Sequence, residues 1–389
     1  MRDRIAATIG LLGELVSFES ISLTPNLDIV GHIRGYLASH GIDSVLSYGA
    51  DGERANLFAT IGPEIDGGVV LSGHTDVVPV TGQAWDTPPF TVVHREDRLY
   101  GRGTVDMKGF LACVLAAVPR FKDADLKRPM HIAFTFDEET GSRGARVLSE
   151  VMGGYPVRPA IAIVGEPTEM KLITGHKGGY ELKTMVTGLE GHASYPGRGV
   201  NAISYATRMI ANLEQVGREL AASADPASDF DPPCSTISVG TISGGVARNV
   251  IAGSCVFDWE LRPVPGDDPE AILAGIEAHV RDVLMPEMQA VSPHADIVTV
   301  LEDAYPGLGT AVDAPAVALV SELTGLNSVA TVPFGTDAGY LDRAGMSTVV
   351  FGPGSIEQAH KPNEFIEVGE IEACHAFLDK LCERLCRDA

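Results

Sequence analysis

The sequence has few basic residues and no long apolar run. It contains 29 Lys and Arg against 52 Asp and Glu, which gives a formal net charge of -23. Nucleic acids and anionic membrane surfaces bind basic protein surfaces, so this charge balance argues against both as partners. No stretch of about 18 uncharged apolar residues is present, so the sequence offers no membrane-spanning helix.

Cysteine is also scarce, with six residues in a chain of 389. None of them form a C-x-x-C pair, and they do not make the dense framework of a small secreted domain. The N-terminal segment starts with basic residues, but Glu14 interrupts its apolar residues, their spacing is helical, and no small-residue cleavage site follows. We therefore expect an amphipathic first helix and a cytoplasmic protein.

The order of the predicted elements divides the chain into two parts. Up to residue 178, and again from residue 304, short β-branched runs such as "VVLSG" and "IAIVG" alternate with helical segments. This alternation indicates an α/β domain with a mixed, mostly parallel sheet that is flanked by helices. Because the C-terminal strand needs a sheet to join, residues 1–178 and 304–389 are expected to form one discontinuous domain.

Residues 179–303 follow a different order. Their pattern predicts strand, helix, two strands, helix and strand, which is the β-α-β-β-α-β order of ferredoxin-like domains. We expect a separate inserted domain. It should expose a sheet edge or a helix face that pairs with a second copy of the chain, which would give a two-fold homodimer.

Acidic and imidazole side chains occur where the predicted strands of the first domain end or where a loop leads into a helix. These residues are His74, Asp106, Glu138, Glu139, Glu166 and His360. In open α/β sheets, ligands bind in the crevice outside the carboxyl ends of the strands. The six side chains are therefore expected to converge at that crevice.

Each of these residues alone has an ordinary structural explanation. A histidine after a strand is usually hydrogen-bonded, an aspartate before a helix usually caps it, and a pair of glutamates is usually solvated. Several carboxylates in one crevice, however, are costly to bury unless a cation compensates their charge. The combined pattern favours a metal site, and two histidines with three carboxylates and no cysteine suit zinc first, with cobalt or manganese as substitutes.

Five ligands exceed the number that one catalytic zinc ion with an open position needs. They suit two ions that are about 3.5–4 Å apart and share a carboxylate and a water. Asp76 follows His74 on the same side of the strand, so its carboxylate is suited to orient the imidazole. Glu138 and Glu139 are adjacent and cannot easily face one ion, so one of them is expected to bind metal and the other to transfer protons.

Eight motifs distributed over nearly the whole chain support this interpretation: "SGHTDVVP", "LYGRGTVDMKGF", "FDEETGS", "VGEPT", "GHASYPGRGVNA", "RNVIAGSC", "ELRPVPG" and "GPGSIEQAHKPNEFI". In this order they resemble the motifs of the co-catalytic zinc amidohydrolases, a family that includes acetylornithine deacetylases, succinyl-diaminopimelate desuccinylases, aminoacylases and related carboxypeptidases. The late stretch "GTDAGYLDRAGMSTVVFGPGSIEQAHKPNEFI" is most similar to the acetylornithine deacetylase branch. The resemblance implies a catalytic domain in two segments and an inserted lid and dimerisation domain.

The resemblance also assigns the metal ligands. Asp106 would bridge two zinc or cobalt ions per subunit. His74 and Glu166 would complete one site, and Glu139 and His360 would complete the other. The family also has a cis peptide bond after the bridging aspartate, which corresponds here to the bond between Asp106 and Met107.

Catalytic roles follow from the same resemblance. Glu138 would act as the general base on a bridging water and would later protonate the leaving amine, while Asp76 would orient His74. His192 of "GHASYP" would donate a hydrogen bond to the oxyanion, from the partner subunit. As a residue alone, His192 is better explained by a structural hydrogen bond in a loop.

The substrate contacts implied by the resemblance are Asn249, Arg262 and the backbone of the "GPGS" loop, with Gly352, Gly354 and Ser355. Arg262 is suited to grip an α-carboxylate with two hydrogen bonds, although an arginine at a strand end also suits a surface ion pair. The "GPGS" loop could offer backbone donors to the same carboxylate, or it could be a plain turn.

The implied activity is metal-dependent hydrolysis of N-acyl amino acids. The late stretch favours N-acetyl-L-ornithine, which gives L-ornithine and acetate in arginine biosynthesis. Acetylcitrulline, acetyldiaminobutyrate or succinyl-diaminopimelate as substrate, or a dipeptidase or carboxypeptidase of the same fold, remain alternatives. A catalytically silent metal-binding dimer is a further alternative, but Glu138 beside the ligands argues against it because a binding protein needs no base there.

Overall fold

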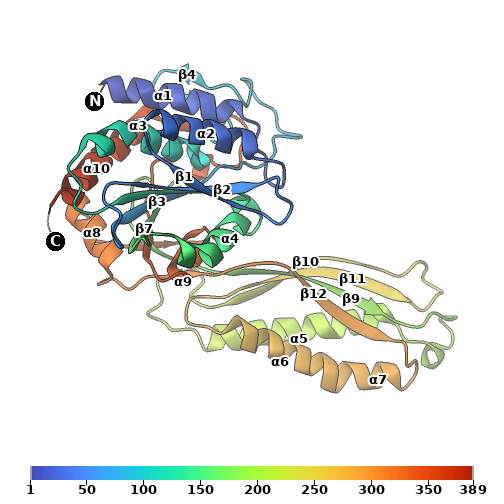
Figure 1. The fold of residues 1–389 in the computed structure, drawn as a ribbon. Coiled ribbons are helices and arrows are strands. Elements are labelled where there is room, and N and C mark those ends of the chain that lie inside the picture. Colours follow the sequence, from blue (N-terminus) through green and yellow to red (C-terminus); the bar gives the residue numbers. More distant parts are fainter. Residues whose placement is uncertain (1, 388–389) are drawn as a thin grey trace. The chain divides into compact units, whose positions relative to one another are not determined.

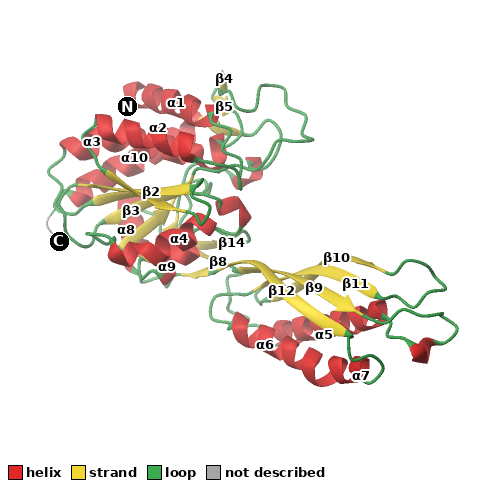
Figure 2. Cartoon of the chain, turned by 45° about the vertical axis from the view of Figure 1, so that its right-hand side comes forward, coloured by secondary structure: helices red, strands yellow, loops and turns green. Residues whose placement is uncertain are grey.

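The chain folds into two compact units in the computed structural model, which describes residues 2–387 (Figures 1 and 2). The first unit comprises the chain up to Gly175, Leu308–Thr331 and the chain from Thr336 onward. The second, which we call the inserted unit, comprises His176–Gly307 and Val332–Gly335. Within the described residues, every helix is too short or too polar to cross a bilayer.

The first unit is built on a nine-stranded mixed sheet, in which eight strands follow the order β1-β2-β6-β3-β7-β15-β8-β13 and β14 pairs with β8. Its central strands β6, β3, β7 and β15 run parallel, whereas β1 and β2 join antiparallel at one side and β8 at the other. The strands are β1 Ser44–Tyr48, β2 Ala55–Ile61, β3 Val69–His74, β6 Met130–Thr135, β7 Ile161–Val164, β8 Ile173–His176, β13 Leu308–Gly309, β14 Ala330–Val332 and β15 Ser347–Val350. The predicted fold class is confirmed.

Helices cover both faces of this sheet, because its central strands are apolar on both sides. Every residue of β3 and of β6 is buried. Figure 1 shows α1, α2 and α3 on one side of the sheet and α4 and α9 on the other. The helices of the unit are α1 Arg2–Ser17, α2 Leu27–Ser39, α3 Gly109–Asp123, α4 Arg143–Val151, α8 Pro315–Thr324, α9 Ala338–Arg343 and α10 Val368–Leu385.

Three short strands form a second sheet in the same unit, in the order β16-β5-β4. They are β4 Val93–Arg95, β5 Arg98–Tyr100 and β16 Phe365–Glu367. The sequence did not predict them, because three residues are too few to show an alternation of apolar and polar side chains. The pairing matters for the site because β5 shortly precedes Asp106 and β16 shortly follows His360, so it joins these two parts of the chain.

The inserted unit contains a four-stranded antiparallel sheet in the order β10-β11-β9-β12. Along the chain its elements are β9 Gly179–Thr187, α5 Ala202–Ala222, β10 Thr236–Gly244, β11 Ser254–Arg262, α6 Pro269–His279, α7 Met285–Gln289 and β12 Asp296–Tyr305. In β9, Leu182, Thr184 and Val186 are buried while Glu181 and Met185 are exposed. This period of two is typical of a sheet that packs against helices on one face only.

Candidate dinuclear metal centre

The carboxyl ends of three neighbouring strands bring most of the predicted ligands together. His74 is the last residue of β3, Glu138 and Glu139 follow β6, and Glu166 follows β7. β3 pairs in parallel with both β6 and β7, and His74 stands opposite Thr135 at the end of β6. The side chains that follow these strands therefore meet at one edge of the sheet.

Asp106 reaches the same edge from the segment Thr104–Lys108, which leads into α3. Its backbone is not helical, with φ -126° and ψ 95°, and its peptide bond to Met107 is cis, as the resemblance implies. Gly103 precedes this segment at φ 80°, and a Cβ there would lie 2.6 Å from Cγ1 of Val77. Only glycine suits that position, and it allows the loop to lie against the residues that follow His74.

The carboxylate of Asp106 faces both predicted histidines. Its Oδ1 lies 3.0 Å from Nε2 of His74, and its Oδ2 lies 3.2 Å from Nε2 of His360. A carboxylate that presents one oxygen to each imidazole has the orientation of a ligand shared by two ions.

The remaining carboxylates divide between the two histidines. Nε2 of His74 lies 3.7 Å from Oε1 of Glu166 and 4.0 Å from Oε2 of Glu138. Nε2 of His360 lies 2.9 Å from Oε2 of Glu139. Potential ligand atoms lie within 4.8 Å of one another in two groups, His74 with Asp106 and Glu139, and His74 with Glu138 and Glu166. The structure thus places all five predicted ligands and Glu138 in one cluster.

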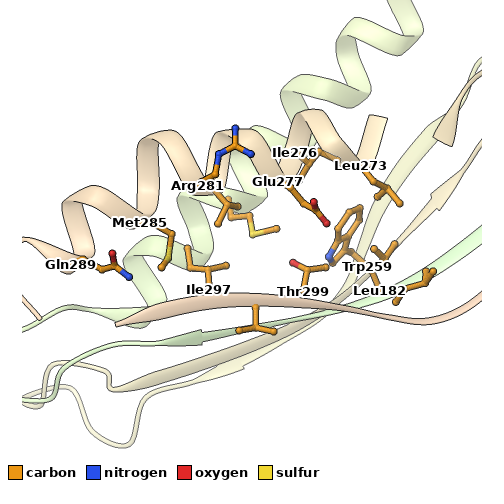
Figure 3. A pocket seen from close by; sticks show the side chains of 14 residues that line it. Leu182, Trp259, Leu273, Ile276, Glu277, Arg281, Met285, Gln289, Ile297 and Thr299 are labelled. Carbon is orange, nitrogen blue, oxygen red and sulfur yellow. The ribbon is translucent and has the colours of Figure 1, made fainter. Parts of the chain in front are cut away.

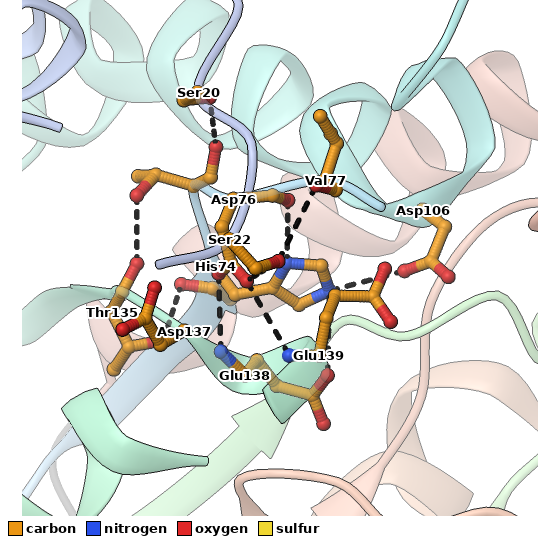
Figure 4. A network of polar contacts seen from close by, with 12 residues as sticks. Ser20, Ser22, His74, Asp76, Val77, Asp106, Thr135, Asp137, Glu138 and Glu139 are labelled. Atoms are coloured by element: carbon orange, nitrogen blue, oxygen red, sulfur yellow. Dashed lines mark hydrogen bonds and ion pairs between the residues drawn. The ribbon is translucent and has the colours of Figure 1, made fainter. Parts of the chain in front are cut away.

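Asp76 supports three members of this cluster (Figure 4). Nδ1 of His74 lies 3.0 Å from the backbone oxygen of Asp76 and 3.5 Å from its Oδ1. The same carboxylate accepts hydrogen bonds from the backbone N–H of Glu138 at 3.1 Å and of Glu139 at 3.4 Å. Since Nδ1 of His74 is engaged by Asp76, its Nε2 faces the cluster.

The charges of the cluster favour cations. Burial, and then the charge of Glu166, raise the pKa of Glu138 well above its usual value, and burial raises the pKa of Glu139 to about 7. Hydrogen bonds with Asp106 and Glu139 raise the pKa of His360 to about 10. Burial thus disfavours the charged form of the two glutamates, while the neighbouring carboxylates favour the charged form of His360, so the cluster has more buried carboxylate than positive charge to compensate it.

The donor set fits divalent metal ions. Among the described residues, the buried Oε1 of Glu166 has no hydrogen-bond partner, which is costly for a carboxylate unless a cation lies nearby. Two imidazoles and several carboxylates without a thiolate are typical ligands of borderline to hard ions such as zinc, cobalt and manganese. The residues present can therefore hold two such ions with Asp106 between them.

Asp337 is a buried carboxylate near this cluster that was not predicted. It precedes α9 and accepts a hydrogen bond of 2.5 Å from Oγ1 of Thr135, the residue opposite His74 in the sheet. Burial raises its pKa to about 6, and the charges of His74 and Asp76 also act on it. The sequence signal is its place in "GTDAGYLD", but an aspartate before a helix is usually explained by capping.

The predicted oxyanion donor and one predicted substrate contact lie together in the inserted unit. His192 is exposed and pairs in an isolated bridge with Val250. The neighbouring backbone oxygen of Asn249 accepts a hydrogen bond of 3.1 Å from Ala193. The segments that contain His192 and Asn249 are therefore adjacent, while their roles in catalysis remain predictions.

Arg262 ends β11 and is half-buried. Its Nη2 lies 2.9 Å from Oε2 of Glu260, and its Nη1 donates a hydrogen bond of 3.2 Å to the hydroxyl of Tyr305. The ion pair corresponds to the structural alternative that the sequence left open. A substrate carboxylate would have to compete with Glu260 for this guanidinium.

The "GPGS" loop is held by partners within the first unit. The Gly352 amide donates to Oγ1 of Thr168 at 3.1 Å, and the Gly354 amide donates to Oε2 of Glu370 at 2.9 Å. Both contacts are typical of a structural turn, the second alternative of the sequence analysis. A substrate-binding role for this loop, including Ser355, remains a prediction.

The inserted unit also contains a cavity of about 670 Å³ between its sheet and the helical segment from α6 to α7 (Figure 3). Trp259, Leu273, Ile276, Met285 and Ile297 contribute to its mostly apolar lining. None of the predicted catalytic or metal-binding residues line it, so the chemistry is not expected there.

Comparisons with known proteins agree with these observations. The chain is 36% identical over 391 residues to acetylornithine deacetylase of Myxococcus xanthus, which covers 99% of each chain. Among solved structures, aminopeptidase PepT of Bacillus cereus has a TM-score of 0.76 at 20% identity and covers 98% of this chain and 99% of its own. The YXEP protein of Bacillus subtilis, a dinuclear metal binding peptidase, has a TM-score of 0.67 at 16% identity and covers 98% of each chain. Residues 70–384, which contain the whole cluster from His74 to His360, match the family model of peptidase family M20/M25/M40, and the chain therefore belongs to that family.

Proposed function

We propose that the protein hydrolyses the amide bond of N-acetyl-L-ornithine to give L-ornithine and acetate, a step of arginine biosynthesis. The observation that carries this proposal is the identity of 36% over essentially the full length to a protein named acetylornithine deacetylase. The cluster of potential metal ligands supports the broader class, metal-dependent hydrolysis of N-acyl amino acids. The structural neighbours share the fold at low identity and do not distinguish one acyl amino acid from another.

Two zinc or cobalt ions per chain are the proposed cofactors. His74 and Glu166 would hold one, His360 and Glu139 the other, and Asp106 would contact both. When bound, the ions would polarise the acyl carbonyl and lower the pKa of a water molecule at the site.

Glu138 is the proposed general base. Its backbone is fixed by Asp76, and its Oε2 lies 4.0 Å from Nε2 of His74, beyond hydrogen-bond distance. Because Glu138 lies beside the proposed ligands but is not one of the five, its carboxylate is suited to take a proton from the attacking water. The same carboxylate can then deliver that proton to the leaving amine.

The inserted unit is proposed to form a homodimer and to supply His192 of the partner as the oxyanion donor. Its sheet has two outer strands, β10 and β12, and His192 is exposed. Asn249 and Arg262 are the proposed substrate contacts of this unit. Sedimentation should reveal a dimer, and a strict monomer with full activity would contradict the role of His192 across subunits.

The experiment that tests the function combines elemental analysis with amine release from four substrates. These are N-acetyl-L-ornithine, N-acetylcitrulline, N-succinyl-diaminopimelate and a dipeptide. Close to two metal ions per chain with a strong preference for N-acetyl-L-ornithine is the expected result. Two ions with a different preferred amide would retain the mechanism and reject the substrate, while a chain without metal or turnover would reject both.

A further inference from the structure

Arg102 and Glu364 form a buried ion pair that the proposed mechanism does not use. Nη1 of Arg102 lies 2.6 Å from Oε2 of Glu364, and each side chain is only 1% exposed. A buried ion pair is weak evidence for a stabilising role, since both charges lose their hydration. The other contacts of the two side chains therefore indicate more about their role than the pair itself.

Glu364 holds the backbone of the loop that contains Asp106. Its Oε1 accepts hydrogen bonds from the backbone N–H of Val105 at 3.0 Å and of Asp106 at 3.3 Å. The backbone oxygen of Glu364 also accepts a hydrogen bond of 2.9 Å from Gly101, at the start of the same loop. Glu364 thus fixes the loop of Asp106 against the segment that follows His360.

Arg102 extends this network to His360 through Gln83. Nη2 of Arg102 donates to Oε1 of Gln83 at 2.6 Å, and Nε2 of Gln83 donates to the backbone oxygen of His360 at 2.8 Å. The amide of Gln83 therefore spans the distance between the buried guanidinium and the backbone of a predicted metal ligand. The indole ring of Trp85 lies 5.2 Å from the guanidinium and covers it.

His360 needs such external support. Its backbone has φ 62°, in the left-handed region that non-glycine residues rarely adopt, and its side chain is 51% exposed. An exposed side chain on a strained backbone has little packing to hold it in place. The hydrogen bond from Gln83 acts at the residue where the strain occurs.

We propose that Arg102, Glu364 and Gln83 are positioning residues that fix Asp106 and His360 relative to each other. They would thereby set the geometry of the half-site that these two ligands share with Glu139. The planar guanidinium of Arg102 serves Glu364 and Gln83 at once, which the single ammonium group of lysine would not do with the same geometry. The inference rests on the proposed metal-dependent function, but not on the identity of the substrate.

The test measures the affinity for each of the two metal equivalents by competition with a chelator, using zinc or cobalt. Glu364→Gln would turn an amide N–H₂ toward either Arg102 or the backbone N–H groups of the Asp106 loop, so one set of hydrogen bonds is lost. Because Asp106 would contact both ions, we expect both metal equivalents to bind more weakly, by about 10–100-fold, as is typical when a residue that supports a ligand is changed. Circular dichroism and Tm should show that the variant is folded.

Gln83→Leu is the second variant, because it keeps both charges of the Arg102–Glu364 pair while it removes the contact to His360, together with the hydrogen bonds that Oε1 of Gln83 accepts from Arg102 and Trp85. It should weaken mainly the equivalent that His360 would hold, because its contact is to His360 and not to the Asp106 loop. Glu367→Gln is the matched control, since it removes a carboxylate from the exposed pair of Glu367 with Arg98, whose side chains are 53% and 47% exposed and whose atoms are 3.2 Å apart. This control should bind both equivalents as the wild type does.

The results separate this inference from the proposed function. If Glu364→Gln and Gln83→Leu are folded and bind both equivalents with wild-type affinity, the positioning role is wrong. If Glu364→Gln does not fold, the metal affinity of Gln83→Leu alone tests the positioning role. A wild type that binds two ions but cleaves none of the tested amides would reject the function and leave the metal test intact. A wild type that binds no metal would overturn both.

Discussion

The carboxylate of Asp76 accepts a hydrogen bond of 3.1 Å from the backbone N–H of Glu138 while its other contacts reach His74. One buried side chain thereby joins the end of β3 to the turn after β6. The proposed metal ligand and the proposed general base share a single support. Asp76 is thus more than an orienting partner for one imidazole.

Asp76→Ala should impair both metal binding through His74 and proton transfer through Glu138. Loss of the carboxylate removes its 3.5 Å contact with His74, whose Nδ1 keeps only the backbone oxygen of residue 76, and leaves the N–H groups of Glu138 and Glu139 without their acceptor. We expect metal affinity to fall about 10–100-fold, with a decrease in kcat. Chelator competition and steady-state kinetics will measure the two effects. Ser22→Ala removes the 2.7 Å hydrogen bond to Asp76 and a 3.3 Å contact with the backbone oxygen of Val77, and it should have a much smaller effect because the Asp76 carboxylate remains. Unchanged affinity and kcat in Asp76→Ala would contradict the role of this support.

Glu138→Gln distinguishes a general base from a metal ligand. The amide keeps the size of the side chain but cannot take a proton, so kcat should fall about 10²–10⁴-fold. Metal content should remain that of the wild type, because Glu138 is not one of the five proposed ligands. Since Glu138 lies within 4.8 Å of ligand atoms of His74 and Glu166, loss of one metal equivalent would instead identify it as a ligand.

Much of the cluster could be predicted because its members follow strongly patterned elements. The fully buried β3 and β6 appear in the sequence as apolar runs, and His74, Glu138 and Glu139 follow them. The rule that parallel strands end at one edge of a sheet then predicted that these side chains converge. The glycines around Asp106 indicated a loop before a helix in the same way.

The supporting residues could not be predicted, because their contacts join loops that are distant in sequence. Arg102 and Glu364 are separated by 262 positions, and Gln83 and His360 by 277. No local periodicity reports a contact of this kind. Asp337 was missed for a different reason, since an aspartate before a helix has an ordinary explanation until its burial is known.

Metal removal should destabilise the first unit as well as abolish turnover. Without cations, the carboxylates of Glu138, Glu139 and Glu166 would be buried beside one another with too few positive partners. A chelator should therefore lower Tm, and zinc or cobalt should restore it. At an ion concentration about 100 times the dissociation constant, binding of one ion contributes about 2.7 kcal/mol. An identical Tm with and without chelator, in a sample shown to lose its metal, would contradict a site within the folded unit.

His375 should make the protein sensitive to mild acid. It lies in α10, and its Nε2 is 2.7 Å from Oγ1 of Thr8. The Thr8 hydroxyl donates a hydrogen bond of 2.9 Å to the backbone oxygen of Arg4. With the Thr8 hydroxyl hydrogen directed to Arg4, Nε2 of His375 is the donor to Thr8. Among the described side chains, its buried Nδ1 has no hydrogen-bond partner.

Burial and the positive charge of Arg4 lower the pKa of His375 to about 4 in the folded chain, although the negative charge of Asp379 acts in the opposite direction. An unfolded histidine has a pKa of about 6.5, so the unfolded state binds more protons between these two values. The contribution of His375 to the free energy of unfolding is therefore constant above pH 6.5 and decreases as the pH falls from 6.5 toward 4. His375→Gln keeps a hydrogen-bonding group for Thr8 and cannot be protonated, so the decrease in Tm over this range should be smaller than in the wild type. Thermal unfolding between pH 7 and pH 4.5 measures this difference, with the exposed His94→Gln as control, and parallel curves for the wild type and His375→Gln would show that His375 is not the responsible group.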